Sequence, residues 1–238
     1  MTALLEICVA DIHSLEAAIE GGADRIELCS ALELGGLTPS SGLMRLAAQA
    51  PIPIYAMIRP RAGDFVFSPR EGELMQADIE AAGEAGLGGV VLGASLPDGR
   101  LDETLLERLR AQAQGLGSTL HRAFDLVPEP LAALETAVAL GFERILTSGG
   151  APTAPEGLDV LVRLHRAARG RIGIMPGSGL TPANIAPLLA ALPVAEVHSS
   201  CSAAGEQWSA EAVRLGFAVG RRRPTRADIV RAFREAMA

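Results

Sequence analysis

The stretch LLEICVADIHSLEAAIEGGADRIELC (residues 4–29) contains the repeating unit that decides the fold. Two short apolar runs, LLEICV from Leu4 and DRIELC from Asp24, flank a stretch at 15–20 that is rich in helix-forming residues. Runs of four to six largely apolar residues, several of them β-branched, are typical of strands in a parallel sheet that helices cover. The stretch therefore predicts one βαβ unit.

The same alternation continues to residue 199. Six further strand-like runs are PIYAMI, GGVVLGA, STLHRAF, FERILT, RIGIMP and VAEVHS, which begin at Pro53, Gly88, Ser118, Phe142, Arg171 and Val194. Helical stretches at 74–85 and 131–140 lie between them, and Ser68-Pro69 is a helix start signal. Eight such units predict an α/β protein of the closed (β/α)8 kind, a TIM barrel.

The length of 238 residues fits one barrel domain, which typically takes ~250 residues. We predict a single domain over 1–238, with a barrel core at about 4–200 and a helical tail at about 205–238. The tail ends in an additional amphipathic helix from Thr225. A doubly wound open sheet is the alternative, but its G-x-G-x-x-G is missing after the first strand, where Val9-Ala10-Asp11-Ile12 stands.

Composition and charge exclude several classes of function. All 21 Lys+Arg residues are arginine, so a lysine Schiff base is excluded. The formal charge of −7 argues against a nucleic-acid partner, which would need a clustered basic face. The run Arg221-Arg222-Arg223 is typical of a solvated surface.

The cysteines and the apolar runs indicate a compartment. Cys8, Cys29 and Cys201 lack the paired spacing of a disulfide framework or a zinc ribbon, which is typical of reduced cytosolic thiols. No signal-like segment follows Met1, and no apolar run approaches the ~18 residues of a membrane span. We therefore expect a cytoplasmic protein without a membrane partner.

Polar side chains recur at alternate positions near the carboxyl ends of the strands. Because strand side chains alternate between faces, these residues share the face opposite to apolar positions such as Ile7 and Ile26. A lone acid or histidine could be a satisfied core group, but several that converge indicate a site at the barrel mouth. The residues expected to line this cavity are Glu6, Cys8, Glu27, Cys29, Met57, Arg59, His121, Arg122 and His198.

Some of these residues could carry out proton transfer. Glu27 or His121 could act as a base, with Arg59 or Arg122 as the electrostatic partner. Asp125 lies beside the histidine in the run His121-Arg122-Ala123-Phe124-Asp125, although a local ion pair is an equally open interpretation. These residues suggest an enzyme that acts on a small anionic or phosphorylated metabolite.

Loops at the mouth are candidates for binding that anion. The long loop 59–65 could form a lid over the ligand. Two strands end in glycine-rich turns, and Thr181-Pro182 opens a helix whose amino end would face the same mouth, although tight turns need glycine anyway. The predicted anion-binding residues are Arg61, Ser148, Gly149, Gly150, Gly177, Ser178 and Gly179.

Soft donors among the inward residues favour a copper ion as a second interpretation. Cys8, Cys29, Met57, His121 and His198 form a sulfur- and nitrogen-rich set that suits Cu(I) better than Mg²⁺ or Ca²⁺. Buried cysteine and methionine are also common fillers of apolar interiors. Both interpretations stay open from the residues alone.

Six stretches resemble the CutC family, in order, from Leu4 to His198: EICVADIHS, GGADRIELCSALELGGLTPS, MIRPRAGDFVFS, LHRAFD, RILTSGGAPTAPEGL and IMPGSG. The resemblance implies the (β/α)8 fold, a cytoplasmic homodimer and a role in copper homeostasis, with Cys8 and Cys29 as the copper-binding residues. The chain departs from the family pattern at Ala62 and in the stretch His198-Ser199-Ser200-Cys201, where the arrangement of ligands is left open.

Overall fold

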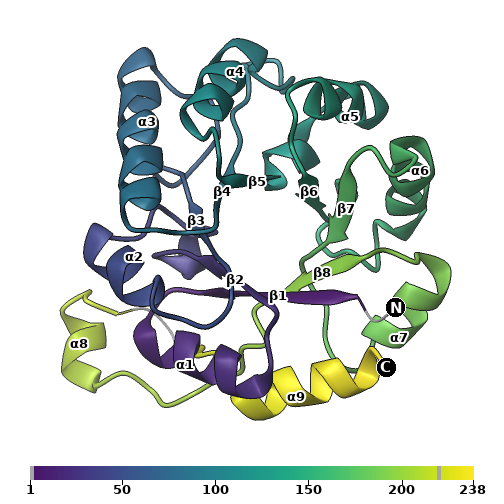
Figure 1. Ribbon diagram of the computed structural model, residues 1–238. Helices are drawn as coiled ribbons and strands as arrows, with labels where there is room; N and C mark the ends of the chain where they lie inside the picture. The colour runs from purple at the N-terminus through teal and green to yellow at the C-terminus, as the bar shows by residue number, and fades with distance from the viewer. Residues whose placement is uncertain (1–2, 219–220) are drawn as a thin grey trace.

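Eight parallel strands form the inner ring of a barrel that helices surround (Figure 1). The computed structural model describes residues 3–218 and 221–238. The strands are β1 (Leu4–Val9), β2 (Arg25–Leu28), β3 (Ile54–Met57), β4 (Gly89–Leu92), β5 (Gly117–Leu120), β6 (Arg144–Thr147), β7 (Gly173–Pro176) and β8 (Glu196–Ser199). Hydrogen-bonded neighbours run in the order β7-β6-β5-β4-β3-β2-β1-β8, and β7 lies beside β8, so the ring is nearly closed. The predicted TIM barrel is confirmed.

The helices cover the outer face of the ring. They are α1 (Ile12–Gly21), α2 (Ser41–Ala47), α3 (Pro69–Glu84), α4 (Glu103–Gln112), α5 (Pro130–Ala139), α6 (Leu158–Ala168), α7 (Ile185–Ala191), α8 (Ala210–Arg214) and α9 (Ala227–Ala236). Helix α3 begins at the predicted signal, since Ser68 and Glu71 form a capping box around Pro69. Outward strand residues such as Ile7 and Ile26 are fully buried beneath these helices and form the main apolar core.

Inside the ring, one aromatic side chain requires glycine on the neighbouring strands. Tyr55 of β3 lies across the barrel near its amino end, where a Cβ at Gly89 would come within 2.5 Å of its ring. A Cβ at Gly117 would overlap the Tyr55 hydroxyl. The guanidinium groups of Arg25 and Arg144 lie 5.1 and 5.2 Å from the centre of the same ring. Large polar side chains thus fill the interior, and glycines on the neighbouring strands leave room for them.

The segment after β8 differs from the predicted helical tail. Residues 202–208 pair with residues 221–225 through antiparallel bridges at Ser202–Thr225 and Gln207–Arg221, and α8 lies between the two paired stretches. We call the described residues 202–218 and 221–225 the arm. Only α9 corresponds to the expected long helix, and it packs against α1 so closely that a Cβ at Gly21 would overlap Val230 (Figure 1). The predicted helical tail at 205–238 is therefore an arm followed by one helix.

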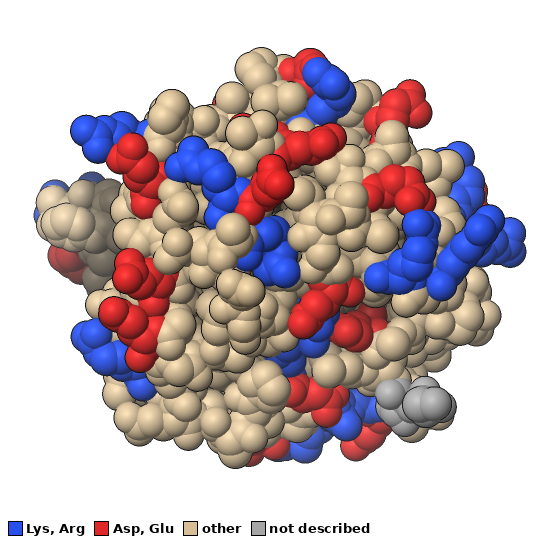
Figure 2. Space-filling model, turned by 45° about the horizontal axis from the view of Figure 1, so that its top comes forward, with Lys and Arg blue, Asp and Glu red and all other residues tan. Residues whose placement is uncertain are grey.

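Acidic and basic side chains are interspersed over the face in Figure 2, and no continuous basic area covers it. Such mixing of signs is typical of a solvated surface rather than of a polyanion-binding one. Among the described residues, no helix has the length and apolar character needed to cross a membrane.

We predict that Gly117→Ala destabilises the barrel, because the new methyl group would occupy the position of the Tyr55 hydroxyl. Overpacking of this kind typically costs about 1–3 kcal/mol of unfolding free energy. Gly42→Ala is the matched control, since its Cβ would meet only the Ser40 hydroxyl at 3.8 Å. Urea unfolding measures both changes, and equal stability of the two variants would contradict the tight packing around Tyr55.

Candidate functional site

A network of buried ion pairs occupies the interior of the barrel. Glu6 is fully buried, and its Oε2 lies 2.5 Å from Nε of Arg25. Nη2 of Arg25 also donates to Glu196, and Glu196 in turn pairs with Nε of Arg144 at 2.8 Å. Two arginines and two acids thus compensate one another where water has little access. Each charge needs these partners, because an isolated buried charge is costly.

The same acid holds a histidine on the neighbouring strand. The register of β1 with β8 puts Glu6 opposite His198, and Nδ1 of His198 lies 2.8 Å from Oε1 of Glu6. Burial raises the pKa of Glu6, but Arg25 and His198 outweigh it and lower that pKa to about 2. Burial also lowers the pKa of His198, yet Glu27 and other neighbours raise it well above its ordinary value. The carboxylate therefore orients the imidazole.

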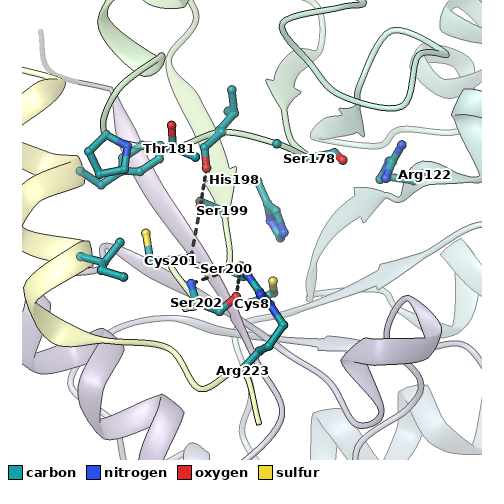
Figure 3. A pocket seen from close by; sticks show the side chains of 15 residues that line it. Cys8, Arg122, Ser178, Thr181, His198, Ser199, Ser200, Cys201, Ser202 and Arg223 are labelled. Atoms are coloured by element: carbon teal, nitrogen blue, oxygen red, sulfur yellow. Dashed lines mark hydrogen bonds between the residues drawn. The ribbon is translucent and has the colours of Figure 1, made fainter. Parts of the chain in front are cut away.

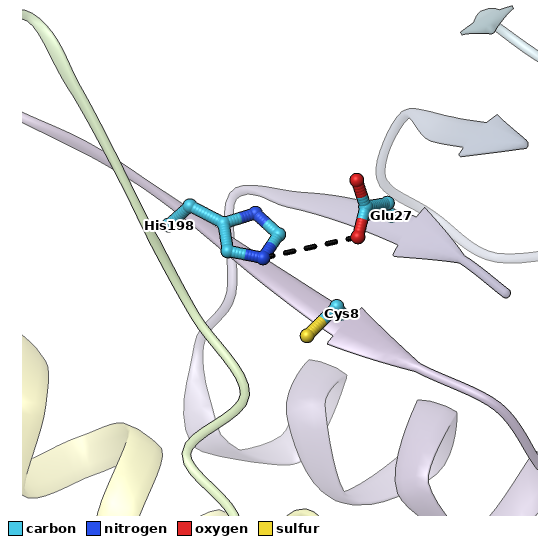
Figure 4. A group of neighbouring side chains, drawn as sticks. All are labelled: Cys8, Glu27 and His198. Carbon is cyan, nitrogen blue, oxygen red and sulfur yellow. Dashed lines mark ion pairs between the residues drawn. The ribbon is translucent and has the colours of Figure 1, made fainter. Parts of the chain in front are cut away.

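Three donor atoms converge above this pair. The register of β1 with β2 puts Cys8 opposite Glu27, and His198 approaches from β8 (Figure 4). Nε2 of His198 lies 3.8 Å from Oε2 of Glu27, and the ligand atoms of all three residues lie within 4.8 Å of one another. Oε1 of Glu27 is buried and has no hydrogen-bond partner among the described residues. A buried acceptor without a partner is typical of a site that a ligand completes.

Cys29 borders this cluster from the position directly after β2. It is fully buried, and its Sγ donates to Oε2 of Glu27 at 3.6 Å. Burial raises the pKa of Cys29 well above its ordinary value, and Glu27 adds to the shift. Met57 packs beside it in a small apolar cluster with Tyr55 and Val91. Of the two nominated cysteines, only Cys8 belongs to the converging group itself.

The donor set fits a soft or borderline metal ion. A thiol sulfur, an imidazole nitrogen and a carboxylate oxygen are ligand types that Cu and Zn accept, whereas Mg²⁺ and Ca²⁺ prefer oxygen. The second nitrogen of His198 is held by Glu6. Metal-binding histidines are commonly fixed in this way by a carboxylate on the far side of the ring.

Two other predicted catalytic residues, Arg59 and His121, lie in a closed part of the mouth. Arg59 donates to the backbone oxygens of Leu34, Gly36 and Gly63, so it fixes the loops around it. Burial lowers the pKa of His121 to about 3, with a further contribution from Arg59. The Phe65 ring lies 4.8 Å from the His121 ring and covers it.

Asp125, another predicted catalytic residue, is engaged by its neighbours, in line with the ion pair that the sequence left open. Its carboxylate pairs with Arg122 at 2.7 Å and accepts from Thr147 and from the backbone N–H groups of Ser148 and Gly150. The carboxylate therefore already fills the turn after β6, where an external anion was expected.

The other predicted anion-binding residues are also largely engaged. The N–H of Gly149 donates to the Thr147 hydroxyl, and the N–H of Gly177 to the Thr147 carbonyl oxygen. Arg61 pairs with Glu71 and Asp64 in the loop before α3.

The helix expected to open at Thr181-Pro182 begins at Ile185, because Asn184 caps a preceding turn by accepting from the Thr181 N–H. The predicted helix amino end at Thr181 is therefore wrong by a few residues. Ser178 and Gly179 do line a cavity beside Cys8 and His198.

That cavity has a volume of about 430 Å³ and opens next to the converging donors (Figure 3). Arg122 and Arg223 reach it from different sides, and Ser200 lies beside Arg223 in the view. Sequence reasoning missed Arg223, since a run of three arginines reads as a solvated surface. The only signal was its place in the segment that follows the last strand.

The sequence profile of the CutC family matches residues 3–203. The chain belongs to the CutC family. A CutC family protein from Rhizobium meliloti (strain 1021) is 60% identical over 97% of this chain and 94% of its own length. One from Caulobacter vibrioides (strain NA1000 / CB15N) is 56% identical over 83% of this chain and 80% of its own.

Solved structures agree with this membership. CutC from Streptococcus agalactiae, which its name assigns provisionally to copper homeostasis, superposes with a TM-score of 0.80 at 33% identity. The match covers 84% of this chain and 99% of that one. Phosphoribosylanthranilate isomerase from Thermotoga maritima superposes with a TM-score of 0.57 at 15% identity, which shows the shared barrel fold alone. The CutC profile ends inside the arm, so most of the arm and all of α9 lie outside it.

In this CutC chain we predict that Arg25→Met strongly destabilises the fold, because two acids, Glu6 and Glu196, lose their shared cation. Breaking a buried pair typically costs about 3–5 kcal/mol of unfolding free energy. Arg226→Met serves as the control, since it removes only an exposed partner of Asp228. Chemical denaturation followed by circular dichroism compares them. A small loss for Arg25→Met, no larger than the control's, would contradict a structural role for the network.

Proposed function

We propose that the chain binds Cu(I) in the barrel mouth, with Sγ of Cys8 and Nε2 of His198 as the principal donors. The observation that carries this proposal is the convergence of Cys8, Glu27 and His198 in a buried site. The provisional copper-homeostasis name of the Streptococcus agalactiae relative supports the choice of metal. Cys29 is then a second sulfur at the edge of the site, beside Glu27.

Each residue has a distinct part in this proposal. Cu(I) favours thiolate and imidazole donors. His198 must release the Nε2 proton before that nitrogen can bind a metal. The Glu6 carboxylate meanwhile stays bonded to Nδ1, the other ring nitrogen. Glu27 contributes negative charge and an unpartnered oxygen, which would balance the charge of a bound cation. Burial of all three donors keeps the site away from bulk water.

We predict that Cys8→Ser and His198→Asn each weaken Cu(I) binding at least tenfold, because each removes a soft donor from the converging group. Cys29→Ser should weaken binding less, since its sulfur contacts Glu27 from outside that group. Anaerobic competition titration against a Cu(I) chelator of known affinity measures these changes.

Cys201→Ser is the matched control for this titration. Its thiol lies outside the converging group, although it lines the neighbouring cavity, and burial raises its pKa to about 11. Unchanged affinity in both Cys8→Ser and Cys29→Ser would remove the copper proposal. Equal weakening by Cys201→Ser would show that the loss does not depend on removing a donor of the converging group.

A second candidate function is proton transfer on a small anionic metabolite. Burial raises the pKa of Glu27, and the adjacent His198 supplies an opposite charge, a combination that suits general acid/base work. The test is a panel of carboxylated and phosphorylated metabolites, in which a thermal shift first selects ligands. A selected ligand should still raise the melting temperature of Glu27→Gln, but this variant should no longer convert it. NMR of the ligand monitors the conversion. A ligand that wild type binds but does not convert would refute this candidate.

Location and assembly complete the proposal. All three cysteines are free, which supports a reducing compartment such as the cytoplasm. A homodimer is carried over from the family resemblance.

A further inference from the structure

The cavity beside the copper-site residues has oxygen-rich walls. Its lining includes five hydroxyl side chains, those of Ser178, Thr181, Ser199, Ser200 and Ser202. Its volume of about 430 Å³ lies within the range of small-molecule sites, which is ~300–1,000 Å³. Ile229 and Phe233 of α9 supply apolar surface on one side. The hydroxyls of Ser178 and Ser199 already donate to backbone carbonyl oxygens, and those of Ser200 and Ser202 bond each other. The walls are therefore polar, but the charge of the cavity must come from other side chains.

Two guanidinium groups give the cavity its charge. Arg122 is partly compensated, because Asp125 pairs with it at 2.7 Å. Arg223 forms no ion pair with any carboxylate of the described residues and donates no hydrogen bond within them. Its side chain extends from the arm toward Cys8 and Ser200 (Figure 3). An uncompensated cation at a hydroxyl-lined cavity favours an anionic ligand.

The arm positions this arginine over the mouth. The bridge between Ser202 and Thr225 and the bond from the Gly205 N–H to the Arg222 carbonyl oxygen hold the returning strand beside the end of β8. Arg222 itself lies over the Trp208 ring at 5.1 Å. Of the consecutive arginines 221, 222 and 223, only Arg223 therefore lines the cavity.

We infer that this cavity binds a small oxyanion, a carboxylate or a phosphate group, and that the positive charge of Arg223 in the arm makes the cavity selective for anions. The inference goes beyond copper binding and needs no metal, and it supplies the anion site that the second candidate function requires. Arg223 lies outside the part of the chain that the CutC profile matches. The proposed selectivity accordingly belongs to the arm rather than to the barrel strands.

We predict that metal-free protein binds inorganic phosphate or malonate saturably, and that Arg223→Gln weakens the preferred anion at least fivefold. The substitution removes one charge from an exposed side chain, so the fold should be unaffected. Arg221→Gln is the matched control, because it lowers the net charge equally from an exposed position that does not line the cavity. Isothermal titration calorimetry at constant ionic strength measures both variants, and the two probes distinguish a phosphate from a carboxylate ligand.

The outcomes separate this site from the copper site. The inference is supported if the anion binds saturably, Arg223→Gln weakens the binding and Arg221→Gln retains it. This conclusion does not depend on the result of the Cu(I) titration. Equal affinity of wild type and Arg223→Gln, equal weakening by both variants, or no saturation with either anion would overturn it. The copper proposal is tested separately, by the Cu(I) titration of the Cys8, Cys29 and His198 variants, because the anion titration uses chelator-treated protein.

Discussion

The pairing of Glu6 with Arg25 inside the barrel constrains the rest of the molecule. Most barrel interiors of this type are filled by branched apolar side chains in layers, whereas here a fully buried acid meets a buried guanidinium at 2.5 Å. Such a pair is tolerated only when each remaining polar atom also finds a partner. Arg25 therefore reaches Glu196 and stacks on Tyr55, and the small residues of β4 and β5 leave the room that the aromatic ring needs.

This constraint extends upward to the candidate site. The carboxylate that pairs with Arg25 through one oxygen holds Nδ1 of His198 through the other. The imidazole can then turn only its Nε2 toward Cys8 and Glu27. Glu6 thus supports both the fold and the candidate site, because a substitution there would remove the partner of Arg25 and the partner of His198. The site is precise because it is built on strands whose register is fixed by their hydrogen bonds.

The sequence predicted what depends on local pattern and missed what depends on distant partners. Apolar runs located all eight strands, since each buried strand carries its own signal. Alternation along β1 and β2 put Glu6 and Glu27 on one face, but nothing in the sequence gave their partners across the ring. Asp125 looked catalytic because its neighbours are titratable, whereas its carboxylate fills a turn after β6, more than twenty residues away. Arg223 was missed because its position depends on the bridge between Ser202 and Thr225, which are far apart in the sequence.

The two sides of the mouth differ in access, and this difference decides which histidine can do chemistry. His121 is enclosed by Phe65, its Nδ1 accepts the Ala123 N–H, and its pKa of about 3 keeps it neutral. A ligand could reach it only after the loop over it moved. His198 instead borders the cavity and keeps a nitrogen turned toward an acid and a thiol. The proposed binding and proton transfer therefore both belong on the side of β1 and β8, where Arg223 of the arm also lines the cavity.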